Sequence, residues 1–189
     1  MKIGYQGIEG SNAEYVAEIF AGKLNISNPE FIPLTSSFNV VDNLIKKEID
    51  YGVMAINNSI GGVVEETFEA VKNDGVDIIS TEIIPIHQSL FKKNETIKIE
   101  DIIVVASHIQ ALKQTERNIS RVFGNSIAKM EIADTALGAK MLSEGSIPDN
   151  VAVICRKKAG ELFGLALIED NIEDEPNNQT EFGLYKIIE

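Results

Sequence analysis

Cysteine, tryptophan and histidine are scarce in this chain. Of its 189 residues, one is cysteine (Cys155), two are histidine (His87 and His108) and none is tryptophan. A single cysteine has no partner for an internal disulfide bond, so we expect a reducing compartment, the cytoplasm. Two histidines without a cysteine cluster argue against a zinc site, and we expect no metal.

Basic residues and long hydrophobic runs are also scarce. The chain has 17 basic and 29 acidic residues, a formal net charge of −12. This balance argues against nucleic acid, because phosphates require a basic surface. No segment approaches the roughly 20 apolar residues of a membrane helix, and residues 1–7 are too short a run for a secretory signal. We therefore expect no membrane association, and local donors such as helix N-termini would have to hold any anionic ligand.

Short hydrophobic runs alternate with helical patterns along the chain. The expected strands are residues 2–5, 30–34, 51–56, 76–90 (in one or two pieces), 102–106, 130–132, 151–154 and 182–188. The expected helices are residues 13–22, 38–47, 62–73, 109–122, 135–144 and 157–163. This alternation is typical of parallel sheets covered by helices, so the sequence predicts an α/β protein. The acidic segment 170–178 reads as a loop before the last strand.

Three serines stand at expected strand-to-helix junctions. Ser11 and Ser107 have the spacing of a capping box, with Glu14 and Gln110 three residues later. Ser59 precedes two glycines, where a helix could start close to a ligand. Because strand ends and helix N-termini favour anions, these junctions could line one anion-binding cleft. Helix capping alone would also explain each serine. The glycine-rich stretch 4–10 lacks the spacing of a nucleotide-binding loop, so we expect no nucleotide cofactor.

Six motifs resemble those of prephenate dehydratases and follow the order of that family. They are residues 5–11 with Glu14 and Ala17; 51–59 with Gly62, Val64 and Thr67; 85–87 with Leu90; 107–114; 134–136 with Ala139 and 161–165; and 178–182. Together these motifs span nearly the whole chain, whereas any one of them would be weak.

The resemblance implies an α/β fold of two lobes with a central cleft, like type II periplasmic binding proteins. We expect lobe 1 to contain residues 1–80 and 166–189 and lobe 2 to contain residues 81–165, with crossings near Thr81 and Leu165. The resemblance also implies a homodimer. Many family members continue into an ACT domain that binds phenylalanine. This chain stops at Glu189, so we expect no feedback by that route.

The resemblance further implies a reaction in phenylalanine biosynthesis, in which prephenate loses water and carbon dioxide to give phenylpyruvate without a cofactor. The protein must hold two carboxylates and help hydroxide to leave, by proton donation or hydrogen bonding. By motif match, Thr180 is the residue expected to assist the leaving hydroxyl. The expected substrate-binding residues are Ser11, Asn58, Ser59, Thr67, Ser107, His108, Gln110 and Gln114.

Several of these features have simpler explanations. Thr67 could be a helix residue that packs against the sheet. His87, in a hydrophobic strand, is typical of a structural hydrogen-bond donor. Gln110 and Gln114 are four residues apart and share one helix face, which spacing alone would describe as solvated. The basic run 156–158 is typical of solvated surface.

Two positions depart from the family pattern. The family has Glu where this chain has Asn57, and it has Arg between Thr and Phe where this chain has Glu181 before Phe182. If the arginine contacts substrate, Glu181 would repel a dicarboxylate by about 1–4 kcal/mol. If the arginine pairs with the glutamate, the two changes remove one ion pair and compensate each other. If the strand is regular at Thr180, alternation points Thr180 and Phe182 one way and Glu181 the other. If the chain kinks at Thr180, Glu181 reaches the cleft, rejects dicarboxylates and favours a ligand with an amine.

Three hypotheses about function therefore remain. The first is a prephenate dehydratase. The second is a related prephenate decarboxylase that does not form the aromatic ring. The third is a non-catalytic protein that binds a small acid or amino acid on the same fold. In each case the partner is a small anionic molecule.

Overall fold

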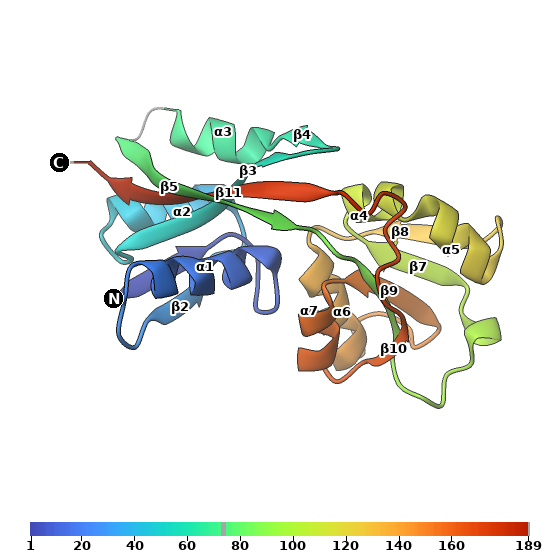
Figure 1. The fold of residues 1–189 in the computed structure, drawn as a ribbon. Coiled ribbons are helices and arrows are strands. Elements are labelled where there is room, and N and C mark those ends of the chain that lie inside the picture. The colour runs from blue at the N-terminus through green and yellow to red at the C-terminus, as the bar shows by residue number, and fades with distance from the viewer. Residues whose placement is uncertain (73–74, 189) are drawn as a thin grey trace. The chain divides into compact units, whose positions relative to one another are not determined.

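The chain folds into two units (Figure 1). The computed structural model describes residues 1–72 and 75–188. The first unit contains Met1–Ile86 and Asn178–Glu189, and the second contains His87–Asn177. Asn73 and Glu189, which end the expected third helix and the expected first lobe, lie outside the described residues.

A mixed sheet forms the centre of the first unit. Its strands are β1 (Lys2–Tyr5), β2 (Glu30–Pro33), β3 (Tyr51–Asn58), β4 (Gly62–Val63), β5 (Val76–Pro85) and β11 (Gln179–Ile187). Strands β1, β2 and β3 are parallel. Strand β11 lies between β3 and β5 and is antiparallel to both. The strand that returns from the second unit thus lies inside the sheet of the first.

Helices cover both faces of this sheet. On one face, α1 (Asn12–Lys23) buries Val16, Ala17 and Phe20 in a core shared with β1, β3 and β11. On the other face, α2 (Ser37–Ile45) and α3 (Glu65–Val71) pack over a core that contains Tyr185. Small and aliphatic residues on these helices fill the space above the pleated strands.

The second unit is built on the same plan. Its strands are β6 (Ser89–Lys92), β7 (Val104–Ser107), β8 (Ala128–Glu131), β9 (Val151–Cys155) and β10 (Ala166–Glu169), in the order β10-β6-β9-β7-β8. Its helices are α4 (Ile109–Gln114), α5 (Glu116–Phe123), α6 (Thr135–Glu144) and α7 (Lys157–Leu162), with a short 3₁₀ helix at Ile99–Asp101. Figure 1 shows α4 and α5 on one side of this sheet and α6 and α7 on the other.

The predicted α/β fold with two lobes is confirmed, and both sheets are mixed, not purely parallel. The boundaries lie later along the chain than the expected crossings near Thr81 and Leu165. Strand β5 runs on to Pro85 within the first sheet. Strand β10, which the sequence analysis missed, pairs with β6 and keeps residues 166–169 in the second unit.

The acidic segment after β10 is anchored to the second unit. The Ile172 amide donates to the Gln88 carbonyl at 2.8 Å, and the Ile172 side chain is buried. The Asp174 carboxylate accepts from the amides of Arg117 and Asn118 at 2.9 and 3.1 Å, which caps the start of α5. This loop therefore has defined contacts although its composition is polar.

Two expected helices differ in the structure. The segment expected as a helix over 62–73 begins with β4, and α3 starts only at Glu65. The helix expected over 109–122 is interrupted at Thr115, whose φ and ψ are −126° and 13°. The buried Thr115 hydroxyl donates to the Ala111 carbonyl at 2.7 Å, a local bond that competes with continued helix.

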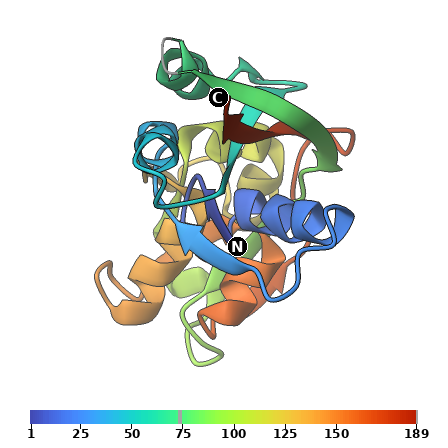
Figure 2. The same ribbon diagram turned by 90° about the vertical axis from the view of Figure 1, so that its left-hand side faces the viewer.

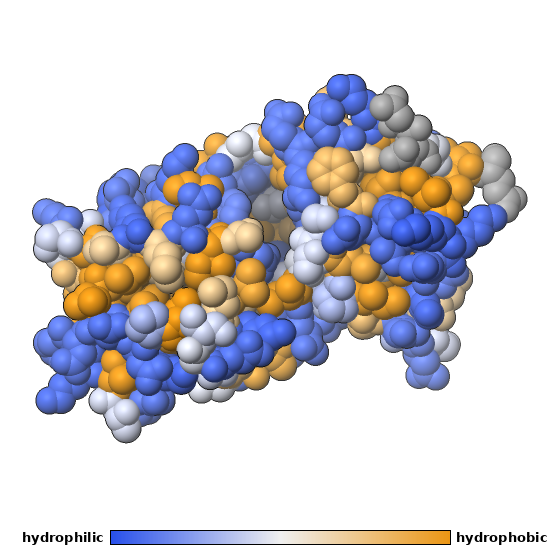
Figure 3. Space-filling view, turned by 180° about the vertical axis from the view of Figure 1, so that it is seen from behind, coloured by the Kyte–Doolittle hydropathy of each residue, from blue (hydrophilic) through white to orange (hydrophobic). Residues whose placement is uncertain are grey.

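Some hydrophobic side chains reach the surface. Figure 3 shows them in orange among hydrophilic residues on both units. In the described part of the chain, no helix is long and apolar enough to cross a membrane.

Glycine is required where α7 approaches β6. A Cβ atom built on Gly160 would overlap the ring of the buried Phe91, whereas one on Gly22 in α1 would meet nothing within 4 Å. Gly160→Ala should lower the free energy of unfolding by about 1–3 kcal/mol. Gly22→Ala, the matched control, should raise it by about 0.5–1 kcal/mol. Urea denaturation of both variants measures the difference, and equal effects would contradict the close approach.

Candidate functional site

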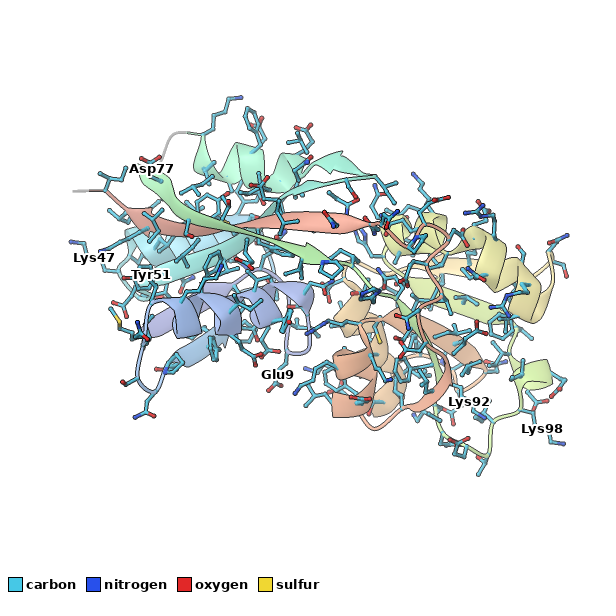
Figure 4. All side chains as sticks on the ribbon, in the orientation of Figure 1. Glu9, Lys47, Tyr51, Asp77, Lys92 and Lys98 are labelled. Atoms are coloured by element: carbon cyan, nitrogen blue, oxygen red, sulfur yellow. The ribbon has the colours of Figure 1, made fainter. Side chains whose placement is uncertain are left out.

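The candidate site of the first unit lies where β1 and β3 end and β11 begins. Figure 4 shows Glu9, in the loop after β1, at this end of the unit, and Lys47, Tyr51 and Asp77 at the opposite end. Because β3 starts at Tyr51 and ends at Asn58, its polar last residues lie at the same end as Glu9. Carboxyl ends of parallel strands are where α/β folds bind ligands.

The Asn58 side chain connects this end of β3 to β11. Its Oδ1 accepts from the amides of Ile60 and Gly61 at 3.0 and 2.7 Å. Its Nδ2 donates to the Thr180 hydroxyl at 2.9 Å and to Asn178 Oδ1 at 2.8 Å. Since two backbone amides occupy the oxygen, the amide orientation is fixed with its nitrogen toward Thr180.

Thr180 is placed by strand register. It pairs directly with Asn58 across the antiparallel β3–β11 ladder, and it is 8% exposed. The Asn58 amide donates to the hydroxyl oxygen of Thr180, so the hydroxyl proton has to be donated in another direction. Such a hydroxyl can donate to a ligand atom that gains negative charge.

Ser59 and Asn178 complete the cluster in the first unit. The Ser59 amide donates to the Gln179 carbonyl at 2.8 Å, and the Gln179 amide donates to Ser59 Oγ at 2.9 Å. Ser59 Oγ also contacts Asn178 Oδ1 at 3.4 Å, and the Asn178 carbonyl accepts from the Ile86 amide at 2.9 Å. Asn178 was not among the expected binding residues, although it opens the terminal motif.

Ser11 caps helix α1, as its spacing predicted. Its hydroxyl accepts from the Glu14 amide at 3.3 Å. The Glu14 carboxylate in turn accepts from the Gly10 amide at 2.7 Å and the Tyr5 hydroxyl at 3.1 Å. Burial, followed by the Glu14 carboxylate, raises the pKa of the Tyr5 phenol. Tyr5 therefore stays protonated and holds Glu14; a contact between Ser11 and substrate stays a prediction.

The other two serine junctions differ from the expectation. Ser59 is followed by the β3–β4 hairpin, not by a helix. Ser107 does not cap α4, because its buried hydroxyl donates to the Ile154 carbonyl at 2.6 Å and ties β7 to β9. His108 is the cap of α4, and its Nδ1 accepts from the Gln110 amide at 3.3 Å. Because no helix starts at Ser59, the expectation of three helix starts is wrong, and an anion at the helix starts after Ser11 and Ser107 stays a prediction.

Thr67 has a structural environment. It is 2% exposed, and its hydroxyl lies 2.8 Å from that of Ser37, which links α3 to α2. The neighbouring Glu66 carboxylate accepts from the Ser37 amide at 3.0 Å and from Gln6 Nε2 at 2.9 Å. These contacts favour the packing explanation for Thr67.

Polar groups in the second unit gather at the ends of β7 and β8. Gln110 and Gln114 lie four residues apart on α4, so they share one helix face. Asp134 caps α6 by accepting from the Leu137 amide at 3.0 Å. Burial raises the pKa of the Asp134 carboxyl, and the backbone amides of Leu137 and Ala136 oppose that rise. Binding roles for His108, Gln110 and Gln114 stay predictions.

His87 makes a structural contact at the start of the second unit. Its Nδ1 lies 2.7 Å from Glu173 Oε1, and the Gln88 amide donates to Glu173 Oε2 at 2.9 Å. In the basic run 156–158, Lys157 pairs with Asp170 at 2.8 Å. Among the described residues, no three His, Cys, Asp or Glu side chains are grouped so as to hold a metal ion.

The two positions that depart from the family motifs are direct neighbours. Glu181 pairs with Asn57 across the β3–β11 ladder, one position beyond the Thr180–Asn58 pair. Phe182 is buried in the core beneath α1. Glu181 alternates with Phe182 and thus points toward the α2 and α3 face of the sheet.

The chain is similar to known proteins in sequence and in fold. The sequence profile described as "Prephenate dehydratase" matches residues 3–186. Arogenate dehydratase 3 of Arabidopsis thaliana is 30% identical to this chain over 96% of its residues. The matched region is 41% of the length of that relative. Prephenate dehydratase of Arthrobacter aurescens, solved with L-Phe, superposes over the whole chain and 60% of its own length, with a TM-score of 0.87 and 24% identity. A periplasmic substrate-binding protein of an ABC transporter from Coxiella burnetii shares the fold, with a TM-score of 0.54 and 12% identity over 99% of this chain and 84% of its own. From the profile match over residues 3–186, the chain belongs to the prephenate dehydratase family.

Proposed function

We propose that this protein is a dehydratase that converts prephenate to phenylpyruvate. The observation that carries the proposal is the fixed Asn58 amide, which donates to the Thr180 hydroxyl at 2.9 Å. This bond directs the Thr180 proton toward a ligand. A homodimer, which the family resemblance implies, is part of the proposal.

The reaction requires groups that hold the two substrate carboxylates and a donor to the hydroxyl that leaves. In prephenate, the electrons of the bond to the ring carboxylate move into the ring as the ring carbon–hydroxyl bond breaks. Carbon dioxide leaves, and the departing hydroxide takes up a proton to become water. A hydrogen bond from Thr180 stabilises the charge that develops on that oxygen in the transition state.

The burial of Thr180 strengthens its contribution. At 8% exposure its hydroxyl has little contact with water, and a hydrogen bond to a developing charge is stronger where water is excluded. The register with Asn58, together with the amides of Ile60 and Gly61, holds the donor in place before substrate arrives. Such preorganisation lowers the barrier because the protein does not need to rearrange during the reaction.

The altered motif positions are compatible with this activity. Glu181 and Asn57 are opposite each other in the ladder, where the family residues Arg and Glu would form a cross-strand ion pair. Glu181 also points away from the face that carries Phe182. The two substitutions together thus remove an ion pair beside the site, and the Thr180 donor remains.

Purified protein incubated with prephenate tests the proposal directly. Ultraviolet absorbance and mass spectrometry should detect phenylpyruvate. Parallel reactions with arogenate, from which the same fragmentation would give phenylalanine, compare the two substrates. A non-aromatic decarboxylated product would identify a decarboxylase instead, and unchanged substrate would identify a binding protein.

Removal of the Thr180 hydroxyl should slow the reaction with little change in binding. Thr180→Val should reduce kcat by about 10²–10³-fold, the usual effect of losing one donor to a developing oxyanion, while KM changes less. Thr180→Ser, the matched control, keeps the hydroxyl and should stay within about tenfold of wild type. Wild-type kcat in Thr180→Val would show that the hydroxyl is not required, and equal losses in both variants would show that side-chain packing matters as much as the hydroxyl.

Introducing the family residues, Arg at position 181 and Glu at position 57, should create a stabilising ion pair and should not add a contact to substrate. Glu181→Arg with Asn57→Glu should show a favourable coupling of about 0.2–1 kcal/mol in a double-mutant cycle of unfolding free energies. Asn57→Glu alone should destabilise, because it places two carboxylates opposite each other. A tenfold gain in kcat/KM, about 1.4 kcal/mol, from Glu181→Arg alone would instead show that the arginine acts on substrate.

A further inference from the structure

A break separates helices α4 and α5. The sequence pattern favours one continuous helix, yet the structure interrupts it at Thr115. In an uninterrupted α-helix each backbone amide donates to the carbonyl four residues earlier. The Arg117 amide would then donate to the Lys113 carbonyl, and the Asn118 amide to the Gln114 carbonyl. Both amides bond elsewhere, and their partners explain the break.

Asp174 supplies these partners. It lies in the loop between β10 and β11, which Figure 2 shows in red, and its side chain is 9% exposed. One carboxylate oxygen accepts from the Arg117 amide at 2.9 Å, and the other accepts from the Asn118 amide at 3.1 Å. The Asp174 amide donates to the Gln114 carbonyl at 2.7 Å. One residue from a distant part of the chain thus takes the place of two helical hydrogen bonds.

The break determines where the last turn of α4 points. The hydroxyl of the buried Thr115 donates to the Ala111 carbonyl at 2.7 Å, which closes α4. The first turn of α4 is held separately by the His108 cap. Gln114 is the last residue of α4 and directly precedes Thr115. A helix that continued through Thr115 would shift Gln114, because Gln114 adjoins the residue whose torsion angles would change.

We propose that Asp174 is a positioning residue, which keeps α4 and α5 apart and so holds the Gln114 side chain where it donates to a substrate carboxylate. The inference rests on the proposed function, in which the substrate is a dicarboxylate, and on the predicted binding role of Gln114. Helix α4 follows the carboxyl end of β7, and α/β folds bind ligands at such strand ends. The Asp174 carboxylate is bonded to two amides and has the same sign of charge as the substrate, so Asp174 acts through Gln114.

Glu175 provides a matched control. It follows Asp174 in the same loop, has the same charge, and its side chain is 67% exposed. Its carboxylate accepts from Arg117 Nη2 at 2.7 Å. This contact joins two exposed side chains and does not involve the backbone amides of α5. Glu175→Ala therefore removes one negative charge from the loop without removing a helix cap.

Steady-state kinetics with prephenate test the positioning role. Asp174→Ala should raise KM about tenfold, the usual effect of losing a hydrogen bond to a charged ligand group. Its kcat should change by less than about threefold, because the Thr180 donor is intact. Asp174→Asn keeps one oxygen for a backbone amide and should raise KM less than Asp174→Ala does. Glu175→Ala should have the KM of wild type, and equal KM values for the two alanine variants would overturn the proposal.

A double-mutant cycle shows whether Asp174 acts through Gln114. Gln114→Ala should also raise KM about tenfold. Adding Asp174→Ala should raise KM no further, because the side chain to be positioned is already absent. An increase of about a hundredfold in the double variant would show independent effects and overturn the proposal. A Gln114→Ala variant with the KM of wild type would overturn it as well.

Nuclear magnetic resonance tests the break independently of turnover. The Thr115 Cα chemical shift should move toward helical values in Asp174→Ala, because the released amides of α5 can then bond carbonyls of α4. It should stay unchanged in Glu175→Ala. If Asp174→Ala does not fold, Asp174→Asn replaces it, with a smaller change in the same direction. A Thr115 chemical shift equal to that of wild type in the Asp174 variant would overturn the proposal.

The outcomes separate this inference from the proposed reaction. If wild type binds prephenate without forming phenylpyruvate, calorimetry compares the same variants, with Kd in place of KM. Non-additive effects of Asp174→Ala and Gln114→Ala on Kd would then support the positioning role and contradict the dehydratase. Phenylpyruvate formation with independent effects of the two substitutions would do the reverse. A wild type that neither binds nor converts prephenate would overturn both.

Discussion

The antiparallel pairing of β11 with β3 brings Asn58 and Thr180 together in the first unit's candidate site. Asn58 ends β3 and Thr180 is the second residue of β11, and the ladder places them opposite each other. A shift of one residue would turn Thr180 toward the other face of the sheet. Packing of Phe182 and Leu184 beneath α1 resists such a shift, because both residues would leave the core.

The same ladder places the Thr180 hydroxyl next to a pair of residues, Asn57 and Glu181, that affects the stability of the strands. One position beyond the Asn58–Thr180 pair, Asn57 and Glu181 lie opposite each other. Because side chains alternate along β11, a change of charge at Glu181 acts on one face of the sheet and leaves the Thr180 hydroxyl on the other. The two faces of a strand thus allow motif residues that adjoin in sequence to have different tasks.

The sequence predicted the general fold because hydrophobic periodicity and junction residues are local signals. Ser11 was identified as a cap from its spacing to Glu14 alone, and the hydrogen bond is present. Ser107 has the same spacing, yet its hydroxyl bonds the Ile154 carbonyl on β9, a partner 47 residues away that no local pattern shows. The contact of Asn178 with Asn58 and the pairing of Asn57 with Glu181 could not be predicted from the sequence either, because each depends on how distant strands pair. Strand β10 was missed because it is an edge strand in which only Ala166 is buried, so its residues show little hydrophobic alternation.

The place of β11 has a consequence for how the chain is made. The second unit is one continuous stretch, His87–Asn177, and its contacts are complete once that stretch has been synthesised. The first unit is not one continuous stretch of chain. Its strands β3 and β5 pair only through β11, which follows the whole second unit in the chain. During synthesis on the ribosome the second unit can fold first. Until β11 is made, the edges of β3 and β5 that pair with it remain unpaired. The first unit then depends on contacts between residues 94 or more positions apart. Contacts of this kind form slowly and leave strand edges exposed to other chains.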